Sequence, residues 1–294
     1  MTYFAAIVVD GALAGALYAL VALSFVVVYR ASRMINFALG ECVMLGSRFV
    51  ALGLHALGLS LPAALALGCA GMAALGVTFN RVVIHRLVGQ PLIAVIMVTL
   101  GLGALVRGAS ALAFRGVPAS IGIPALAEPI VVGGVPIAAD RLAAAVVAAA
   151  CTGLVAWLFH GSRTGVALRA IADDQQAAMS AGIDLDRHLA LMWALMGVLS
   201  ALAGTLWTLA AASSLGVVLV GLKVFPIVIV GGLDSIAGAI VGALLIGVLE
   251  SLAAGYLDPL LGGGFSTIAS YLVLLAALIV RPYGLFGRAD VRRV

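Results

Sequence analysis

The residues of this sequence that could do chemistry are few, and their spacing excludes the common catalytic motifs. The one lysine, Lys223, lies near two glycines but lacks the Gly-Lys-Ser/Thr order by which a P-loop holds phosphates. No H-E-x-x-H, G-x-S-x-G or G-x-G-x-x-G pattern occurs either. We therefore expect a chain that is not an enzyme and that does not bind ATP through a P-loop.

The histidines and cysteines indicate no metal site and no cofactor. His85, His160 and His188 lie near arginines at the edges of apolar runs, where an imidazole is typical of a polar tip at a membrane surface. The three cysteines lie inside apolar runs without any C-x-x-C pair, as small buried side chains do.

Three carboxylates, those of Asp10, Glu41 and Glu250, lie in or near apolar runs. A carboxylate in mid-membrane costs about 2.5–3.5 kcal/mol on insertion scales, so it faces a bundle interior or water. All three stand toward the ends of their runs. Each therefore either takes part in packing or in a transport path, or keeps its carboxylate in the membrane interface.

The elements that hold these residues must be membrane helices. Of the 294 residues, 64% are hydrophobic and 10% are charged, whereas a soluble domain is roughly half apolar and a quarter charged. This composition excludes an ordinary soluble protein, a disordered chain and a nucleic-acid binder. The apolar residues come in continuous runs, which predicts helices in a lipid bilayer and disfavours a transmembrane β-barrel.

Nine apolar runs are candidate membrane spans. They cover 4–29, 36–54, 61–82, 92–113, 142–159, 189–212, 217–233, 236–254 and 266–281. Glycines and polar residues interrupt 36–54 and 217–254, a pattern typical of broken or re-entrant helices along a transport path. We expect an all-α, polytopic transmembrane bundle of eight to ten crossings, with nine as the predicted number.

The arginines predict the orientation of this bundle. Clusters follow the first, third and fifth runs and close the chain, and cytoplasmic loops carry such an excess. With nine crossings the clusters fall on one side, so the N-terminus is outside and the C-terminus is cytoplasmic. The chain is then a single domain over 1–294 whose longest polar loop, 160–188, is cytoplasmic.

The loop 160–188 has the composition of a docking element. Its alanines and other good helix formers predict one or two short helices outside the bilayer. Asp173 and Asp174 suit the start of the second helix, and Gly182 suits its end. These defined limits favour a docking element over a solvated connector.

Small residues at helical spacing predict close packing of two helices. Gly11, Gly15 and Ala19 share one helix face, and Gly238 and Gly242 share another. Such faces pack either within this chain or against another subunit.

The two interrupted segments predict the course of the transport path. The candidates along it are small or polar residues next to an interruption: glycines leave room for backbone or substrate, and the others supply a few polar groups. They are Asn36, Gly40, Glu41, Gly232, Ser235 and Gly238.

The loop 160–188 and several longer blocks of the sequence resemble a known family. The pattern Gln176-Ala177-Ala178-x-x-x-Gly182 resembles the EAA–x3–G coupling loop of ABC importer permeases, with Gln176 in place of the usual Glu. Longer blocks resemble branched-chain amino acid permeases of the LivH type. These blocks are 15–23, 35–41, 165–173 and 230–239, and 281–287 resembles the C-terminal signature of that family.

The resemblance implies a type II ABC importer permease in the plasma (inner) membrane of a bacterium. Such a permease moves branched-chain or other hydrophobic amino acids into the cell by alternating access. Its implied partners are a second, LivM-type permease, two cytoplasmic ATP-binding subunits and an external solute-binding protein. The residues implied to couple this chain to the ATPases are Arg169, Asp173, Gln176, Ala177, Ala178 and Gly182.

Two alternatives stay open. Leu39 stands where the family commonly has His, which leaves room for a permease of the same family that carries urea, short amides or aromatic acids. The other alternative is a stand-alone secondary transporter or channel, which would transport without ATPase partners.

Overall fold

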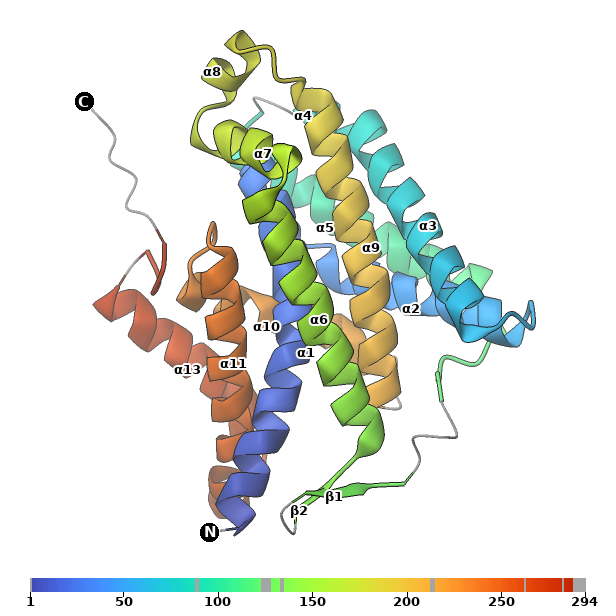
Figure 1. The fold of residues 1–294 in the computed structure, drawn as a ribbon, viewed down its shortest axis with the longest axis vertical. Coiled ribbons are helices and arrows are strands. Elements are labelled where there is room, and N and C mark those ends of the chain that lie inside the picture. The colour runs from blue at the N-terminus through green and yellow to red at the C-terminus, as the bar shows by residue number, and fades with distance from the viewer. Residues whose placement is uncertain are drawn as a thin grey trace.

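The computed structural model describes residues 2–87, 90–122, 128–132, 135–211, 215–261, 263–281 and 283–287, and most of them are helical (Figure 1). The longer helices are α1 (Thr2–Ser32), α3 (Leu61–Phe79), α5 (Leu92–Ala113), α6 (Ala139–Gly161) and α9 (Leu185–Ala211). The shorter ones are α2 (Leu39–His55), α4 (His85–Leu87), α7 (Arg163–Asp173), α8 (Gln175–Ser180), α10 (Leu215–Gly231), α11 (Ile236–Leu252), α12 (Asp258–Leu261) and α13 (Phe265–Val280). Two π-helical turns, η1 (Asn80–Ile84) and η3 (Ala253–Leu257), extend α3 and α11.

Each predicted apolar run coincides over most of its length with a helix of the structure. In the described residues six helices are long and apolar enough to cross a membrane. They are Tyr3–Ser32, Leu61–Leu87, Ile93–Ala113, Ala139–Gly161, Leu185–Ala211 and Ile236–Leu261. The apolar helices Val218–Gly231 and Phe265–Val280 are shorter than a full span. A helical, polytopic membrane protein is thus confirmed, and the count of nine crossings stays a prediction.

Helix α1 forms the centre of the bundle. Its residues 17–28 are all buried, because α6, α9, α10 and α11 pack around it. Toward its start, Gly11 and Gly15 lie against α11: a Cβ atom at these positions would lie 2.7 Å from Cα of Val248 and 2.8 Å from Cα of Leu244. This small-residue face therefore allows close backbone approach between two helices of the same chain.

The chain turns into the bundle between α1 and α2. Residues 33–36 are not helical, and Arg33 has a φ of 55°, in the left-handed region. Helix α2 begins only at Leu39 and lies crosswise to α1 and α9 (Figure 1). Gly40 lies against α10, where a Cβ would meet the carbonyl oxygen of Val218 at 2.5 Å. The interruption predicted in 36–54 thus lets α2 start inside the bundle.

The bundle has two distinct ends (Figure 1). At one, which we call the α7–α8 end, α7 and α8 lie near α4 and the end of α1, and His85 contacts Asp186 at 3.2 Å. The segments 29–33, 233–237 and 283–287 line one hollow at this end. The opposite end carries the N-terminus and a β-hairpin, and we call it the hairpin end. The described arginines of the predicted cytoplasmic loops therefore gather at the α7–α8 end.

A short hairpin is added to the helical bundle that the sequence predicts. Strands β1 (Ile130–Val132) and β2 (Val135–Ile137) pair antiparallel, with Ile130 opposite Ile137. Their β-branched side chains favour an extended backbone. The strands are so short that they add little to a composition dominated by helices.

Candidate functional site

The predicted coupling loop folds as α7 and α8, and polar caps define where each begins. The hydroxyl oxygen of Ser162 accepts a hydrogen bond from the Gly165 backbone N–H at 2.9 Å, just before α7. The Asp174 carboxylate accepts from the N–H groups of Gln176 and Ala177 at 2.8 and 3.0 Å. Such caps satisfy donors that the first turn of a helix leaves open. The helix start predicted at Asp173 and Asp174 lies at Asp174, while Asp173 ends α7.

Gly182 ends α8 in a left-handed conformation, with a φ of 84°. Its N–H donates to the Met179 carbonyl at 2.9 Å, and the Ile183 N–H donates to the Ala178 carbonyl at 3.1 Å. These two bonds form a Schellman motif, whose left-handed position favours glycine because glycine has no Cβ. No described atom lies within 4 Å of the place where a Cβ would stand, so a side chain there would project away from this chain.

Arginines tie α7 to the membrane helices. Arg169 donates to the carbonyl oxygen of Phe159 near the end of α6. Arg33, just after α1, donates to the carbonyl oxygen of Ala172 near the end of α7 at 2.9 Å. A guanidinium at the last carbonyls of a helix satisfies open acceptors and suits the helix dipole. A displacement of α7 must therefore move the ends of α1 and α6 or break these bonds.

The coupling candidates divide into inward and outward groups. Ala178 is buried, and Arg169 is half-buried against α6. Gln176, Ala177 and Gly182 are exposed, as is Met179 beside them. The outward group is a small, mostly uncharged surface at the tip of the molecule.

The first path candidates lie inside the bundle. Asn36 is 2% exposed; its Oδ1 accepts from the Ala38 N–H at 2.9 Å, and its Nδ2 has no partner among the described residues. The buried carboxylate of Glu41 forms an ion pair with Arg107 of α5, whose side chain is largely exposed. Arg107 was not predicted as a partner of Glu41, although it is the single charged residue in the run 92–113.

The second path candidates lie elsewhere, at the α7–α8 end. The Ser235 hydroxyl oxygen accepts from the Gly238 N–H at 2.9 Å and caps α11. Gly232 has a φ of 108° and lies against Gly287, whose N would be 2.5 Å from a Cβ at Gly232. Gly238 lies in the same way against the backbone of Gly231. Backbone thus fills the room that these glycines leave, and the structure does not bring this group together with Asn36 and Glu41.

Helix α11 also packs against α10 through Gly242. A Cβ at Gly242 would lie 2.6 Å from the carbonyl oxygen of Ile227. The face that carries Gly238 and Gly242 therefore lies against a helix of the same chain.

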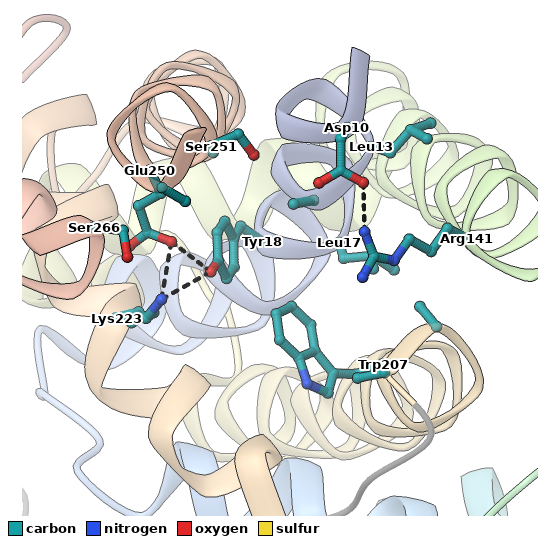
Figure 2. Close-up of a pocket in the computed structure, with 15 residues that line it drawn as sticks. Asp10, Leu13, Leu17, Tyr18, Arg141, Trp207, Lys223, Glu250, Ser251 and Ser266 are labelled. Carbon is teal, nitrogen blue, oxygen red and sulfur yellow. Dashed lines mark hydrogen bonds and ion pairs between the residues drawn. The ribbon is translucent and has the colours of Figure 1, made fainter. Parts of the chain in front are cut away.

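A polar cluster inside the bundle was not predicted from the sequence. Lys223 of α10 forms an ion pair with Glu250 of α11 at 2.9 Å, and Tyr18 of α1 donates to the same carboxylate at 2.7 Å (Figure 2). Beside it, Asp10 of α1 pairs with Arg141 of α6. The acids were singled out from the sequence but their partners were not, because separations of 27 and 131 residues follow no helical period. The one available signal was that Lys223 is the sole lysine of the chain and lies in an apolar run.

Comparison with known proteins finds one family over most of the chain. The family model described as "Branched-chain amino acid transport system / permease component" matches residues 7–281. The chain is 29% identical to the high-affinity branched-chain amino acid transport system permease protein BraD of Pseudomonas aeruginosa, over 97% of this chain and 96% of that protein. It is 28% identical to the corresponding LivH protein of Escherichia coli, over 99% of this chain and 98% of that one.

One solved structure has a similar fold. It is described as PsaBC from Streptococcus pneumoniae in complex with Fab, and it matches with a TM-score of 0.53 over 94% of this chain and 92% of that chain. The sequence identity is 15%, so the similarity concerns the fold alone.

Proposed function

This chain belongs to the family of branched-chain amino acid transport permease components, and we propose that it is the membrane-spanning subunit of an ABC importer for branched-chain or other hydrophobic amino acids. The observation that carries the proposal is the α7–α8 element. Its limits are defined by side-chain and backbone caps, it presents Gln176, Ala177 and Gly182 outward, and arginines tie it to α1 and α6. Such an element suits a partner that pushes on the permease from outside the bilayer.

ATP hydrolysis takes place in two cytoplasmic partner subunits that bind the α7–α8 element. Their closure displaces α7, and the bonds of Arg33 and Arg169 pass this displacement to the ends of α1 and α6. Because α1 is the buried centre of the bundle, its movement changes the packing of the surrounding helices. The permease then alternates between outward-open and inward-open states.

The full importer also contains a second, LivM-type permease and an external solute-binding protein. In this arrangement the α7–α8 end faces the cytoplasm and the hairpin end faces outward, in the inner membrane of a bacterium. The gathering of described arginines at the α7–α8 end supports this orientation. The hairpin end is then the place where the solute-binding protein delivers its substrate.

The orientation is tested by labelling single cysteines with a membrane-impermeant thiol reagent on intact cells. Cys42, Cys69 and Cys151 are first replaced by alanine. Cysteines at positions 86 and 175 are expected to stay unlabelled until the membrane is opened, whereas Ile130→Cys in the hairpin labels at once. Labelling of 86 or 175 from outside would overturn the orientation.

The transport function is tested by reconstituting this chain in proteoliposomes with a second permease, the two ATP-binding subunits and a solute-binding protein. Leucine, isoleucine and valine uptake is expected only when both ATP and the binding protein are supplied. Uptake by this chain without ATPase subunits would identify a stand-alone transporter. ATP-dependent uptake of urea, short amides or aromatic acids in place of leucine would assign the substrate to another branch of the same family.

A further inference from the structure

A partly open cavity of about 240 Å³ lies between helices α1, α9, α10 and α11, and Arg141 of α6 and Ser266 of α13 also form part of its wall (Figure 2). The Tyr18–Lys223–Glu250 cluster and the Asp10–Arg141 pair both line it. Pockets for drug-sized ligands are roughly 300–1,000 Å³, so this cavity suits a smaller molecule. Its wall is mostly apolar, and Figure 2 shows Trp207 between the Tyr18–Lys223–Glu250 cluster and the Asp10–Arg141 pair. A cavity of this kind has the size and lining of a site for a small amphipathic ligand.

The hydrogen-bonding capacity of the first cluster is not fully used. Lys223 and Tyr18 both donate to one carboxylate oxygen of Glu250, Oε2, at 2.9 and 2.7 Å. The other oxygen, Oε1, is buried and has no partner in the part of the chain that the structure describes. A buried carboxylate oxygen without a donor is costly, so a donor from a ligand would be bound favourably there. The terminal torsion of a glutamate is soft, which allows either oxygen to turn toward the cavity.

The same cluster has cationic capacity to spare. An ammonium group has three donors, and Lys223 uses two of them, on Glu250 and on the Tyr18 hydroxyl at 3.2 Å. A carboxylate that accepts hydrogen bonds from a cation and an ammonium that donates them to an anion thus stand side by side. This is the complement of the ammonium and carboxylate that an α-amino acid carries on one carbon atom.

The rest of the cavity suits an apolar side chain. The Trp207 ring stacks on Tyr18 with ring centroids 5.4 Å apart, and Leu13 and Leu17 of α1 also line the cavity. These groups offer hydrocarbon and aromatic surface next to the charged cluster. A small polar solute such as urea would leave this surface without a partner.

The cavity also has a route toward the hairpin end. A second hollow of about 480 Å³ adjoins it and is lined by residues of α1 and by Ile137 of the hairpin. Asp10 and Arg141 line both hollows, and both of their side chains are half exposed. Their ion pair therefore stands at the mouth between an outer hollow and the inner cavity.

We propose that this inner cavity is a transient binding site for the zwitterion of an apolar α-amino acid. The ammonium binds the Glu250 carboxylate, the carboxylate binds Lys223, and the side chain lies against Trp207. This assignment rests on the proposed transport function and adds to it the residues that hold the substrate within the permease. The Asp10–Arg141 pair closes the mouth of the site toward the hairpin end.

The test is photo-crosslinking of the assembled transporter in proteoliposomes with a diazirine analogue of leucine, followed by mass spectrometry of the permease. The label is expected on residues 10–18 of α1 and on the α9 peptide that contains Trp207. Excess leucine should abolish it. Two analogues should leave the label in place at the same concentration. They are leucinamide, which lacks the carboxylate, and 4-methylpentanoate, which lacks the ammonium. Label elsewhere in the chain, or equal competition by all three compounds, would overturn the site.

Variants sharpen this result. Glu250→Gln keeps the shape of the side chain and is expected to lower labelling and leucine uptake about tenfold or more, because a charge-assisted hydrogen bond is lost. Thr208→Val is the matched control: Thr208 neighbours Trp207 but donates to the Gly204 carbonyl of its own helix and does not line the cavity. Labelling of Glu250→Gln at the level of the unmodified protein would also overturn the site. If this variant fails to fold, the competition experiment still tests the site, because it uses the unmodified protein.

Uptake measured in parallel separates the two proposals. Leucine uptake without label in the cavity would overturn the site and leave the transport function standing. If no hydrophobic amino acid is taken up under any condition, the transport function is wrong and the site falls with it.

Discussion

The α7–α8 element and the Tyr18–Lys223–Glu250 cluster are both polar, but they are built in opposite ways. In the α7–α8 element the caps join residues at most five positions apart, as in the bond from the Ile183 N–H to the Ala178 carbonyl. In the cluster the bonds join residues 27, 205 and 232 positions apart. The first is therefore encoded locally, and the second exists only when α1, α10 and α11 are packed. We expect changes in the first to alter coupling while the bundle stays folded, and changes in the second to alter the fold as well.

The largest effect that tests this comparison is expected for Gly182→Leu. A residue with a Cβ in the left-handed region costs roughly 1–2 kcal/mol, and the new side chain projects outward toward the partner. Uptake is expected to be lost while membrane insertion and the melting temperature of the permease stay near normal. The measurements are uptake, ATPase co-purification and thermal unfolding.

Gly116→Leu is the matched control for this prediction. Gly116 also has a positive φ, of 78°, and also has no described atom within 4 Å of a Cβ, but it lies in the segment after α5. The Gly116→Leu variant has the same backbone strain but lies outside the α7–α8 element, so uptake is expected to remain. Equal loss in both variants would mean that strain and not docking causes the effect.

The next effect is expected for Glu250→Ala, on stability. Removal of one partner of a buried ion pair costs about 3–5 kcal/mol, because the other charge stays buried without compensation. Here that charge is Lys223, whose side chain is 23% exposed. Thermal unfolding in detergent should show a clear fall in melting temperature. The double variant Lys223→Met with Glu250→Leu should recover most of it, since apolar residues replace the pair.

That double variant also separates stability from substrate binding. It is expected to fold well and still to lose labelling by the leucine analogue. Equal stability of the single and double variants would show that the cluster is not an electrostatic unit, and would remove the contrast drawn above.

A smaller effect is expected for Asp174→Ala. Loss of a capping carboxylate at a helix start costs about 1 kcal/mol, and here it loosens only α8. Partial loss of uptake is expected with an unchanged melting temperature, and Asp174→Asn should restore uptake because an amide oxygen also caps. A lowered melting temperature of the whole permease would contradict local encoding of the element.

The smallest effect is expected for Gln176→Glu. Gln176 is exposed on α8, and its side chain makes no hydrogen bond that the caps depend on. The change also restores the residue usual in the coupling loops that this segment resembles. Uptake and ATPase rates within about twofold of the unmodified protein are expected, since surface substitutions rarely exceed ±0.5 kcal/mol. A large loss would show that the partner surface selects the amide.

The sequence by itself determined the class of protein and its local elements. Continuous apolar runs identify membrane helices because a span must bury every backbone polar group in lipid. The end of α8 at Gly182 was predictable because a left-handed residue at a helix end favours glycine, and Asp174 was predictable because helix starts favour short acceptors. Gly11 and Gly15 of α1 predicted a close contact with another helix, since small side chains at a four-residue spacing share one helix face.

Only the tertiary structure shows which helices pack against one another. The spacing of Gly11 and Gly15 cannot say that α11 and not another subunit lies against them. Nothing in the sequence distinguishes Gly238, filled by the backbone of Gly231, from a glycine that leaves room for substrate. The hairpin at 130–137 was missed because its pairing contributes little to composition or period.

The cluster of Tyr18, Lys223 and Glu250 shows the limit most clearly. Each helix could be predicted from its own residues, because its hydrogen bonds close within four positions along the chain. The meeting of three such helices depends on how their side chains interdigitate, which is a property of pairs of surfaces and carries no signature in any one segment. Hydrogen bonds within a helix or its caps can thus be predicted from neighbouring residues, whereas a site assembled from distant helices depends on how those helices pack.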